Sequence, residues 1–367
     1  MKGQWIGLYT GSAEGRLMIN IDEVDDHYEV VVYANPKDKL IPSSVAYITT
    51  KNKNKNQKTT AYINPVDPRN GNQYKWEEIK NLYPPEVMHS DQAEVTFKVR
   101  SGKLHVKSTS DIGLELESTL TKPSDDVESK VSGRKMSWKQ FKAHVSRISK
   151  SKYLFRGQKE PWRLRTSFHR RGRYRINRFI QYDVTRLHQR LSAITSHYFD
   201  LTVPDQNGAF FNLLQHHGYP TPLLDWSFSP YVAAFFAFRD HPIKYDGEGE
   251  IRIYIFDNEA WQKRYPQIQV IDPPFPHLSV MSFIAINNPR LVPQQAVTTV
   301  TNIDDIEAYL IDRESESKNQ YLTAIDIPAK DREKAMQDLK FMGITAGSMF
   351  PSIDGVCEEL RENNFDE

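Results

Sequence analysis

The sequence is poor in cysteine, in long apolar runs and in any excess of charge. Its one cysteine, Cys357, excludes an internal disulfide and a zinc site built from several thiolates, and it indicates a reducing compartment. No stretch approaches the roughly 18 apolar residues of a membrane span. The N-terminus also lacks the apolar core of a secretory signal. We therefore expect a cytoplasmic protein that makes no membrane contact.

The charges balance, with 48 Lys and Arg against 47 Asp and Glu in 367 residues. A nearly neutral chain has no global attraction for nucleic acid, so any charged partner must be recognised locally. The length suggests two domains, since single domains typically hold about 100–200 residues.

Residues 1–121 alternate apolar and polar side chains between turn residues, as in Tyr28-Glu29-Val30-Val31-Val32. This pattern predicts an antiparallel barrel or sandwich, which we interpret as a recognition domain for a protein acceptor or a trigger. The run 51–58 (KNKNKNQK) is too polar to bury and predicts a hairpin tip, with phosphate contact as the alternative. Residues 122–136 carry few apolar groups and are predicted to be a linker.

Residues 137–367 mix helix and strand patterns and predict an α+β domain. Ser137 and Gln140 form a capping box, and Pro230 stands at the first position of an apolar helix. We also expect an amphipathic helix over 180–198 and one that Asn207 caps and Gly218 ends. The other predicted strands are 250–257, 282–287 and 321–327, and the other helices lie near 304–312, 330–341 and 351–362.

Two segments of this region are more specific than its composition. They are Phe155-Arg156-Gly157, and Gln215-His216-His217-Gly218 followed by Thr221 and by Leu223-Leu224-Asp225-Trp226 with an Ala/Phe-rich helix behind. Together they resemble the prokaryotic FRG domain family, named for its Phe-Arg-Gly element. Asn288-Pro289-Arg290 with Gln294-Gln295, and residues 342–355, resemble its later elements.

The order of these elements is also similar to that of ADP-ribosyltransferases, in which Arg or His, then Ser, then Glu follow on successive strands. Arg156, Ser227 and Gln294 or Gln295 fall in this order. The resemblance implies an ADP-ribosyltransferase-like fold and NAD as substrate. It suggests an NAD-directed ADP-ribosyltransferase or NAD glycohydrolase of a bacterial stress, toxin or phage-defence system. We expect no metal, because the sequence has no His-x-x-x-His or carboxylate-rich spacing that would support a metal site.

Each role follows from the chemistry of NAD cleavage, which needs a cation for phosphate, an aromatic surface and a group that supports an oxocarbenium-like state. Arg156 suits pyrophosphate because guanidinium binds it bidentately. The expected catalytic residues are Arg156, Asp225, Ser227, Gln295 and His216. The expected ligand-binding residues are Phe155, Gly157, Gln215, Thr221, Trp226, Tyr231, Arg290 and Gln294.

Three alternatives remain open on the residues alone. In the first, Arg156 forms only a structural salt bridge with Asp225. In the second, Gln294 or Gln295 stands where the transferases have a glutamate, and a neutral amide cannot stabilise a cation as a carboxylate does. If Asp225 does not compensate, the domain binds a nucleotide or nucleic acid without turnover. The basic stretch Arg163 to Arg178 would contact nucleic acid, or would be a solvated face paired with the acidic tail 354–367.

Overall fold

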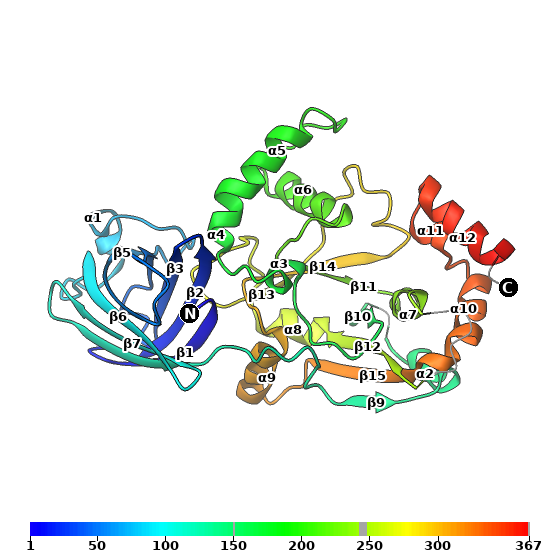
Figure 1. Cartoon of the computed structure of the whole chain (residues 1–367), viewed down its shortest axis with the longest axis horizontal. Helices are drawn as coiled ribbons and strands as arrows, with labels where there is room; N and C mark the ends of the chain where they lie inside the picture. The colour runs from blue at the N-terminus through cyan, green and yellow to red at the C-terminus, as the bar shows by residue number, and fades with distance from the viewer. Residues whose placement is uncertain (150, 242–247, 366–367) are drawn as a thin grey trace.

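The computed structural model describes residues 1–149, 151–241 and 248–365. An antiparallel barrel occupies residues 3–120, and a region of helices around a seven-stranded sheet follows it (Figure 1). The two-part organisation with an all-β first part and an α+β second part is therefore confirmed. The first part is a closed barrel rather than a sandwich.

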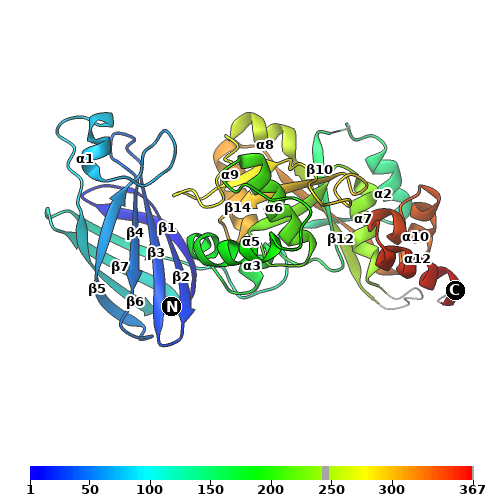
Figure 2. The same ribbon diagram turned by 90° about the horizontal axis from the view of Figure 1, so that it is seen from above.

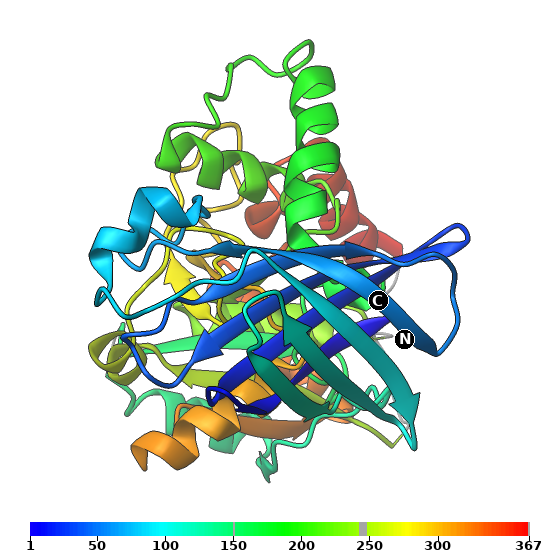
Figure 3. The same cartoon turned by 90° about the vertical axis from the view of Figure 1, so that its left-hand side faces the viewer.

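Eight strands form the barrel in sequence order, and the pairing of Tyr9 in β1 with Ser118 in β8 closes it (Figure 3). Inward side chains such as Ile19, Phe97 and Leu104 fill its interior because alternate residues of a strand share one face. The loop between β4 and β5 covers 50–55, so the predicted hairpin tip is confirmed but shorter. The strands are β1 (Gly3–Gly11), β2 (Gly15–Val24), β3 (His27–Pro36), β4 (Ser44–Thr49), β5 (Asn56–Pro65), β6 (Gln92–Arg100), β7 (Lys103–Ser110) and β8 (Glu115–Leu120), with a short helix α1 (Trp76–Ile79) before β6.

Part of the outer face of the barrel is also buried. Met18, Val31, Tyr33 and Val45 point outward and pack with Ile303 of the second region. Polar contacts border this apolar patch, including the hydrogen bond from the Tyr33 hydroxyl to Asp272 at 2.9 Å. The barrel is thus attached to the second region by a packed interface.

The second sheet has the order β13-β14-β11-β10-β12-β15-β9, and all its pairs are antiparallel except β15 with β9. Strand β9 lies inside the segment 122–136 that we predicted as a linker, so this prediction is wrong for residues 133–135. They extend the sheet because β15 would otherwise present an unpaired edge. The strands are β9 (Gly133–Lys135), β10 (Tyr153–Gln158), β11 (Leu223–Ser227), β12 (Glu250–Asp257), β13 (Leu278–Met281), β14 (Ala296–Thr301) and β15 (Leu322–Pro328).

Helix α7 (Pro230–Arg239) is the buried helix of this region, as its apolar sequence predicts, and it packs on β10 and β12 (Figure 2). Ser229 caps α7, and Ser137 and Gln140 form the predicted capping box of α2. The remaining helices are α2 (Trp138–Val145), α3 (Ser167–Arg170), α4 (Ile176–Arg178), α5 (Thr185–Leu191), α6 (Pro204–His216), α8 (Asn258–Arg264), α9 (Ile306–Ser317), α10 (Arg332–Phe341), α11 (Ala346–Met349) and α12 (Ile353–Phe365), with a π-helical turn at Phe179–Val184 before α5.

Three local predictions are wrong. The helix predicted over 180–198 ends at Leu191. The N-cap residue of α6 is Val203 rather than Asn207, because Pro204 takes the first position of that helix. The strand predicted over 282–287 lies earlier, at β13. Strand β14 escaped prediction because both of its faces are covered, so its sequence lacks alternation.

The central sheet splits between β10 and β11. These strands pair at one position only, Phe155 with Ser227, whereas β10 pairs with β12 along six residues. From that single pair the strands diverge, and Arg156 and Asp225 stand on opposite sides of the opening.

Candidate functional site

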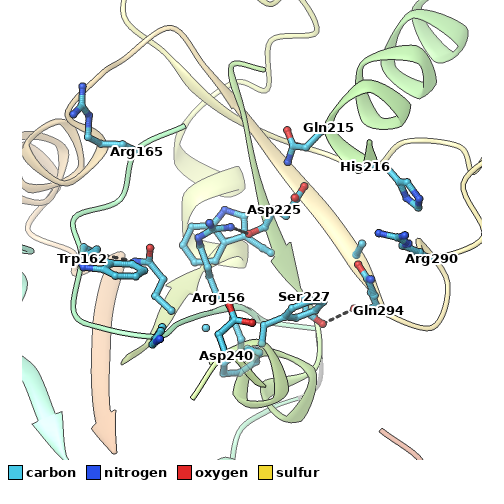
Figure 4. Close-up of a pocket in the computed structure, with 18 of the residues that line it drawn as sticks. Arg156, Trp162, Arg165, Gln215, His216, Asp225, Ser227, Asp240, Arg290 and Gln294 are labelled. Atoms are coloured by element: carbon cyan, nitrogen blue, oxygen red, sulfur yellow. Dashed lines mark hydrogen bonds between the residues drawn. The ribbon is translucent and has the colours of Figure 1, made fainter. Parts of the chain in front are cut away.

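The guanidinium of Arg156 bridges the split in the sheet. Its Nη1 donates a hydrogen bond of 2.6 Å to the main-chain oxygen of Asp225, from β10 across to β11 (Figure 4). The link joins two residues 69 positions apart in the sequence. The predicted salt bridge between the two side chains does not form, because the guanidinium binds the main chain instead of the carboxylate.

A cavity of about 770 Å³ opens at this split, a size typical of small-molecule sites. Ten of the thirteen predicted site residues line it, namely Phe155, Arg156, Gly157, Gln215, His216, Asp225, Trp226, Ser227, Arg290 and Gln294. Thr221, Tyr231 and Gln295 do not. The fold therefore brings most of the predicted residues to one place from β10, α6, β11 and the loop before β14.

Arg156 is the central cation of this cavity. It has no ion pair with any residue that the structure describes, and its Nε is buried without a hydrogen-bond partner. Burial lowers the pKa of Arg156 to about 10, and the nearby Arg170 acts in the same direction against the Asp225 carboxylate. A guanidinium held under such conditions favours an incoming anion.

Two further arginines face the same cavity without an ion pair to any described residue. Arg170 donates only to the main-chain oxygen of Arg165, at 2.7 Å, and Arg290 lies over the ring of Phe350 at 4.8 Å. Burial and neighbouring arginines lower the pKa of both groups. The cavity thus gathers three guanidinium groups whose charge no described carboxylate neutralises in an ion pair, and this favours the binding of an anion.

Asp225 provides a carboxylate at the centre of this positive surface. Its side chain is exposed to the cavity, while the surrounding protein raises its pKa above the ordinary value by desolvation. Gln215, Arg156 and Thr298 oppose that increase. Gln215 is oriented for this contact because its Oε1 accepts from the Thr221 hydroxyl, which leaves its amide N–H groups for Asp225. Thr221, fully buried, is a positioning residue rather than a ligand contact.

Several predicted contacts are occupied by the fold itself. The ring of Trp226 is buried in the core and donates to Thr299 at 3.0 Å, so the expected stacking on nicotinamide by this residue is wrong. The Ser227 hydroxyl donates to the main-chain oxygen of Gln294 at 2.7 Å and accepts from the Ser229 N–H. It ties β11 to the loop before β14 and leaves no proton for a carboxamide.

Phe155 and Gly157 serve packing. Phe155 is buried against α7, and a Cβ at Gly157 would stand 1.8 Å from the main-chain oxygen of Ala233 in that helix. Only glycine permits this approach of β10 to α7. The Phe-Arg-Gly element thus places two residues toward the helix and one, Arg156, toward the cavity.

The remaining predicted residues lie at the border of the site or outside it. Gln295 is exposed with a positive φ, and Tyr231 packs on Trp138, so neither reaches the cavity. Gln294 lines the cavity and donates to the main-chain oxygen of Met349 at 2.9 Å. His216 also lines it. Burial, followed by Arg290, lowers the pKa of this imidazole to about 4, so it is neutral at physiological pH.

Sequence reasoning missed an aromatic and two asparagines of the site. Trp162 lines the cavity opposite Arg290, and 37% of its surface is exposed (Figure 4). Trp226, which we had expected to bind the ligand, is only 3% exposed. Asn212 and Asn288 also line the cavity, and a side-chain hydrogen bond joins them. Trp162 follows Gly157 by five positions, and this closeness to the Phe-Arg-Gly element was the signal available in the sequence.

The basic stretch Arg163 to Arg178 is largely neutralised inside the molecule. Arg163 and Arg165 pair with Asp305 and Asp304, and Arg175 and Arg178 share Glu29 of the barrel. Arg173 pairs with Asp183. The predicted partner of this stretch, the acidic tail, contacts Arg239 and Arg332 instead. A continuous nucleic-acid surface along 163–178 is therefore not supported by the structure.

Two features are absent from the part of the chain that the structure describes. Residues 1–149, 151–241 and 248–365 contain no cluster of three or more side chains suited to a metal ion. No helix in the same ranges combines the length and apolar character needed to cross a bilayer.

Comparisons with known proteins bear on the same segment. No curated protein and no solved structure matches the chain. Residues 151–245 match the family model described as the FRG domain, a span shorter than the predicted 137–367 that contains Arg156, Gln215 and Asp225. This match supports the assignment of that part of the chain to the FRG domain family.

Proposed function

We propose that the cavity binds a dinucleotide of the NAD type and that the FRG region cleaves its nicotinamide glycosidic bond. The observation that carries this proposal is the convergence of Arg156, Arg170 and Arg290 on the cavity that Asp225 lines. None of the three arginines is in an ion pair with a described residue, and the carboxylates of Asp126 and Asp240 also line the cavity. Guanidinium groups suit a pyrophosphate, because each offers two parallel donors. The volume of about 770 Å³ accommodates a ligand of this size.

The chemistry assigned to Asp225 is electrostatic. When the bond between ribose C1′ and the nicotinamide nitrogen breaks, its electron pair leaves with nicotinamide and positive charge remains on the ribose. The Asp225 carboxylate would stabilise that charge, and Trp162 offers an exposed ring for nicotinamide. Water then adds to C1′ and releases its proton to solvent, which gives ADP-ribose; an acceptor side chain in place of water would give ADP-ribosylation.

A second candidate is nucleotide binding without turnover. At the position where ADP-ribosyltransferases carry a glutamate, this chain has Gln294, whose side-chain amide donates to the main-chain oxygen of Met349. No glutamate is among the described residues that line the cavity. If Asp225 does not replace that glutamate, the region senses a nucleotide and the barrel conveys the result to a partner. A role in bacterial stress, toxin or phage-defence systems belongs to either form of the proposal.

Release of nicotinamide from NAD by the purified full chain tests the proposal. We expect turnover that Arg156→Met and Asp225→Asn abolish. Arg186→Met and Asp312→Asn, exposed positions outside the cavity, make the same chemical changes and should retain it.

Binding is measured in parallel by thermal stabilisation with NAD and ADP-ribose. Stabilisation that requires Arg156 but occurs without nicotinamide release would favour the second candidate. Absence of both stabilisation and release would refute each of them.

A further inference from the structure

We infer that a second cavity, at the junction of the barrel and the FRG-containing region, binds a small amphipathic anion. Its volume is about 1070 Å³. One end of the barrel supplies residues 8–16, 35–43 and 66–71, and the loop 268–276 before β13 reaches toward that end (Figure 2). The two cavities share no lining residue, so this site is separate from the one at Arg156.

An apolar body fits the walls of this second cavity. Leu8 of the barrel is 70% exposed and Val270 of the loop is 48% exposed, although both line the same hollow. Ile41, Pro274 and Phe275 extend the apolar surface between them. A ligand that covered these side chains would remove apolar area from water, which favours binding by about 25 cal/mol per Å².

Two side chains that line the same space each carry a hydrogen-bond donor without a partner. Nδ2 of Asn35 and Nε of Arg313 are both buried and lack a partner among the described residues. Tyr9 lies beside them with its ring buried, and Gly15 makes room for that ring, since a Cβ there would stand 2.7 Å from it. Buried donors are normally satisfied. Neither atom is exposed to the cavity itself, so a small shift of its side chain would be needed before it met an acceptor on a ligand.

The charge of that acceptor follows from the cations of the wall. Five basic residues and two carboxylates line the cavity. Asp67 is neutralised by Arg69 at 2.6 Å, and one glutamate, Glu316, serves both Arg16 and Arg313. Lys37 and Lys39 form no ion pair within the described ranges. The surplus is positive, and a carboxylate, sulfonate or phosphate head would meet it.

Fluorescence titration of the full chain with 1-anilinonaphthalene-8-sulfonate tests this inference, since the dye joins an apolar body to an anionic head. We expect one saturable site. The double variant Lys37→Glu/Lys39→Glu should weaken binding by about tenfold or more. Val270→Trp should weaken it by filling the hollow. Lys98→Glu/Lys103→Glu makes the same charge change on exposed strands of the barrel outside the cavity and should have no effect.

N-phenyl-1-naphthylamine, which has the same rings without the sulfonate, isolates the head group. It should bind about tenfold more weakly and should not respond to the lysine variants. Loss of dye binding in Arg156→Met with no effect of the Lys37, Lys39 and Val270 changes would place the dye in the first cavity and overturn the inference. Binding insensitive to all of these variants would place it on exposed apolar surface and would overturn it equally. None of these outcomes depends on whether NAD is cleaved.

Discussion

Replacing Arg156 by Met should make the protein slightly more stable while removing nucleotide binding. A buried cation without an ion pair costs folding free energy at neutral pH, because the folded state favours its uncharged form. A pKa lowered to about 10 corresponds to about 3 kcal/mol when one pKa unit equals about 1.4 kcal/mol. Partial exposure to the cavity screens the charge and reduces this to about half.

The hydrogen bond to the Asp225 oxygen offsets part of the gain. Its loss costs about 0.5–1.5 kcal/mol. The Met side chain keeps the apolar stem, so the net effect is a gain of roughly 1 kcal/mol. For a domain of this size that raises Tm by roughly 2–4 °C.

Differential scanning fluorimetry of the ligand-free protein measures this change. Arg252→Met is the control, since Arg252 is a buried arginine of the same sheet that forms a bidentate ion pair with Asp326 at 2.7 and 2.8 Å. That variant leaves the Asp326 carboxylate buried alone and should lose about 3–5 kcal/mol. If Arg156→Met lowers the Tm by an amount similar to that of Arg252→Met, Arg156 is a structural residue and the reasoning is refuted.

Three shorter predictions concern other features. Asp225→Asn should abolish nicotinamide release and be at least as stable as the native chain at pH 7. The fold raises the pKa of Asp225, so the charged carboxylate destabilises the native state, and this cost appears as the pH rises from the ordinary carboxyl pKa through the raised value. The stability difference between Asp225→Asn and the native chain should therefore be smaller at pH 3 than at pH 7, and an equal difference at both would contradict this. If the chain cleaves NAD as proposed, kcat of the unsubstituted protein should increase with pH through that raised pKa, and a rate independent of pH between 4 and 7 would argue against a carboxylate role. Gly157→Ala should destabilise the region by roughly 2–4 kcal/mol in urea denaturation, since its Cβ would overlap the Ala233 oxygen; an unchanged midpoint would mean that β10 and α7 can separate freely.

Local chemistry determined much of the architecture. Alternation of side chains predicted the barrel strands because each strand has one face inside. The Ser137 capping box and the proline at the start of α7 act within a few residues, so they could be identified without tertiary information. The apolar helix 230–239 could only be a buried one.

The candidate site was predictable as a set of residues and not as a set of roles. The Phe-Arg-Gly and Leu-Leu-Asp-Trp segments indicated where the cavity would be built. Whether a side chain on β11 faces the cavity or the core depends on strand register, and register turned Asp225 toward the cavity and Trp226 into the core. Trp162, from outside both segments, supplied the exposed ring instead.

Sequence alone determined most of the strands and helices, because propensity, capping and periodicity depend on neighbours a few residues apart, whereas β9 and β14 were recognised only in the structure. Only the tertiary structure decided that Arg156 binds the main chain of Asp225 rather than its carboxylate, and that the basic stretch is neutralised by Glu29 and Asp304. These contacts join residues far apart in the chain. Their pairing depends on how the sheet splits and how the barrel packs on it, and no local pattern encodes either.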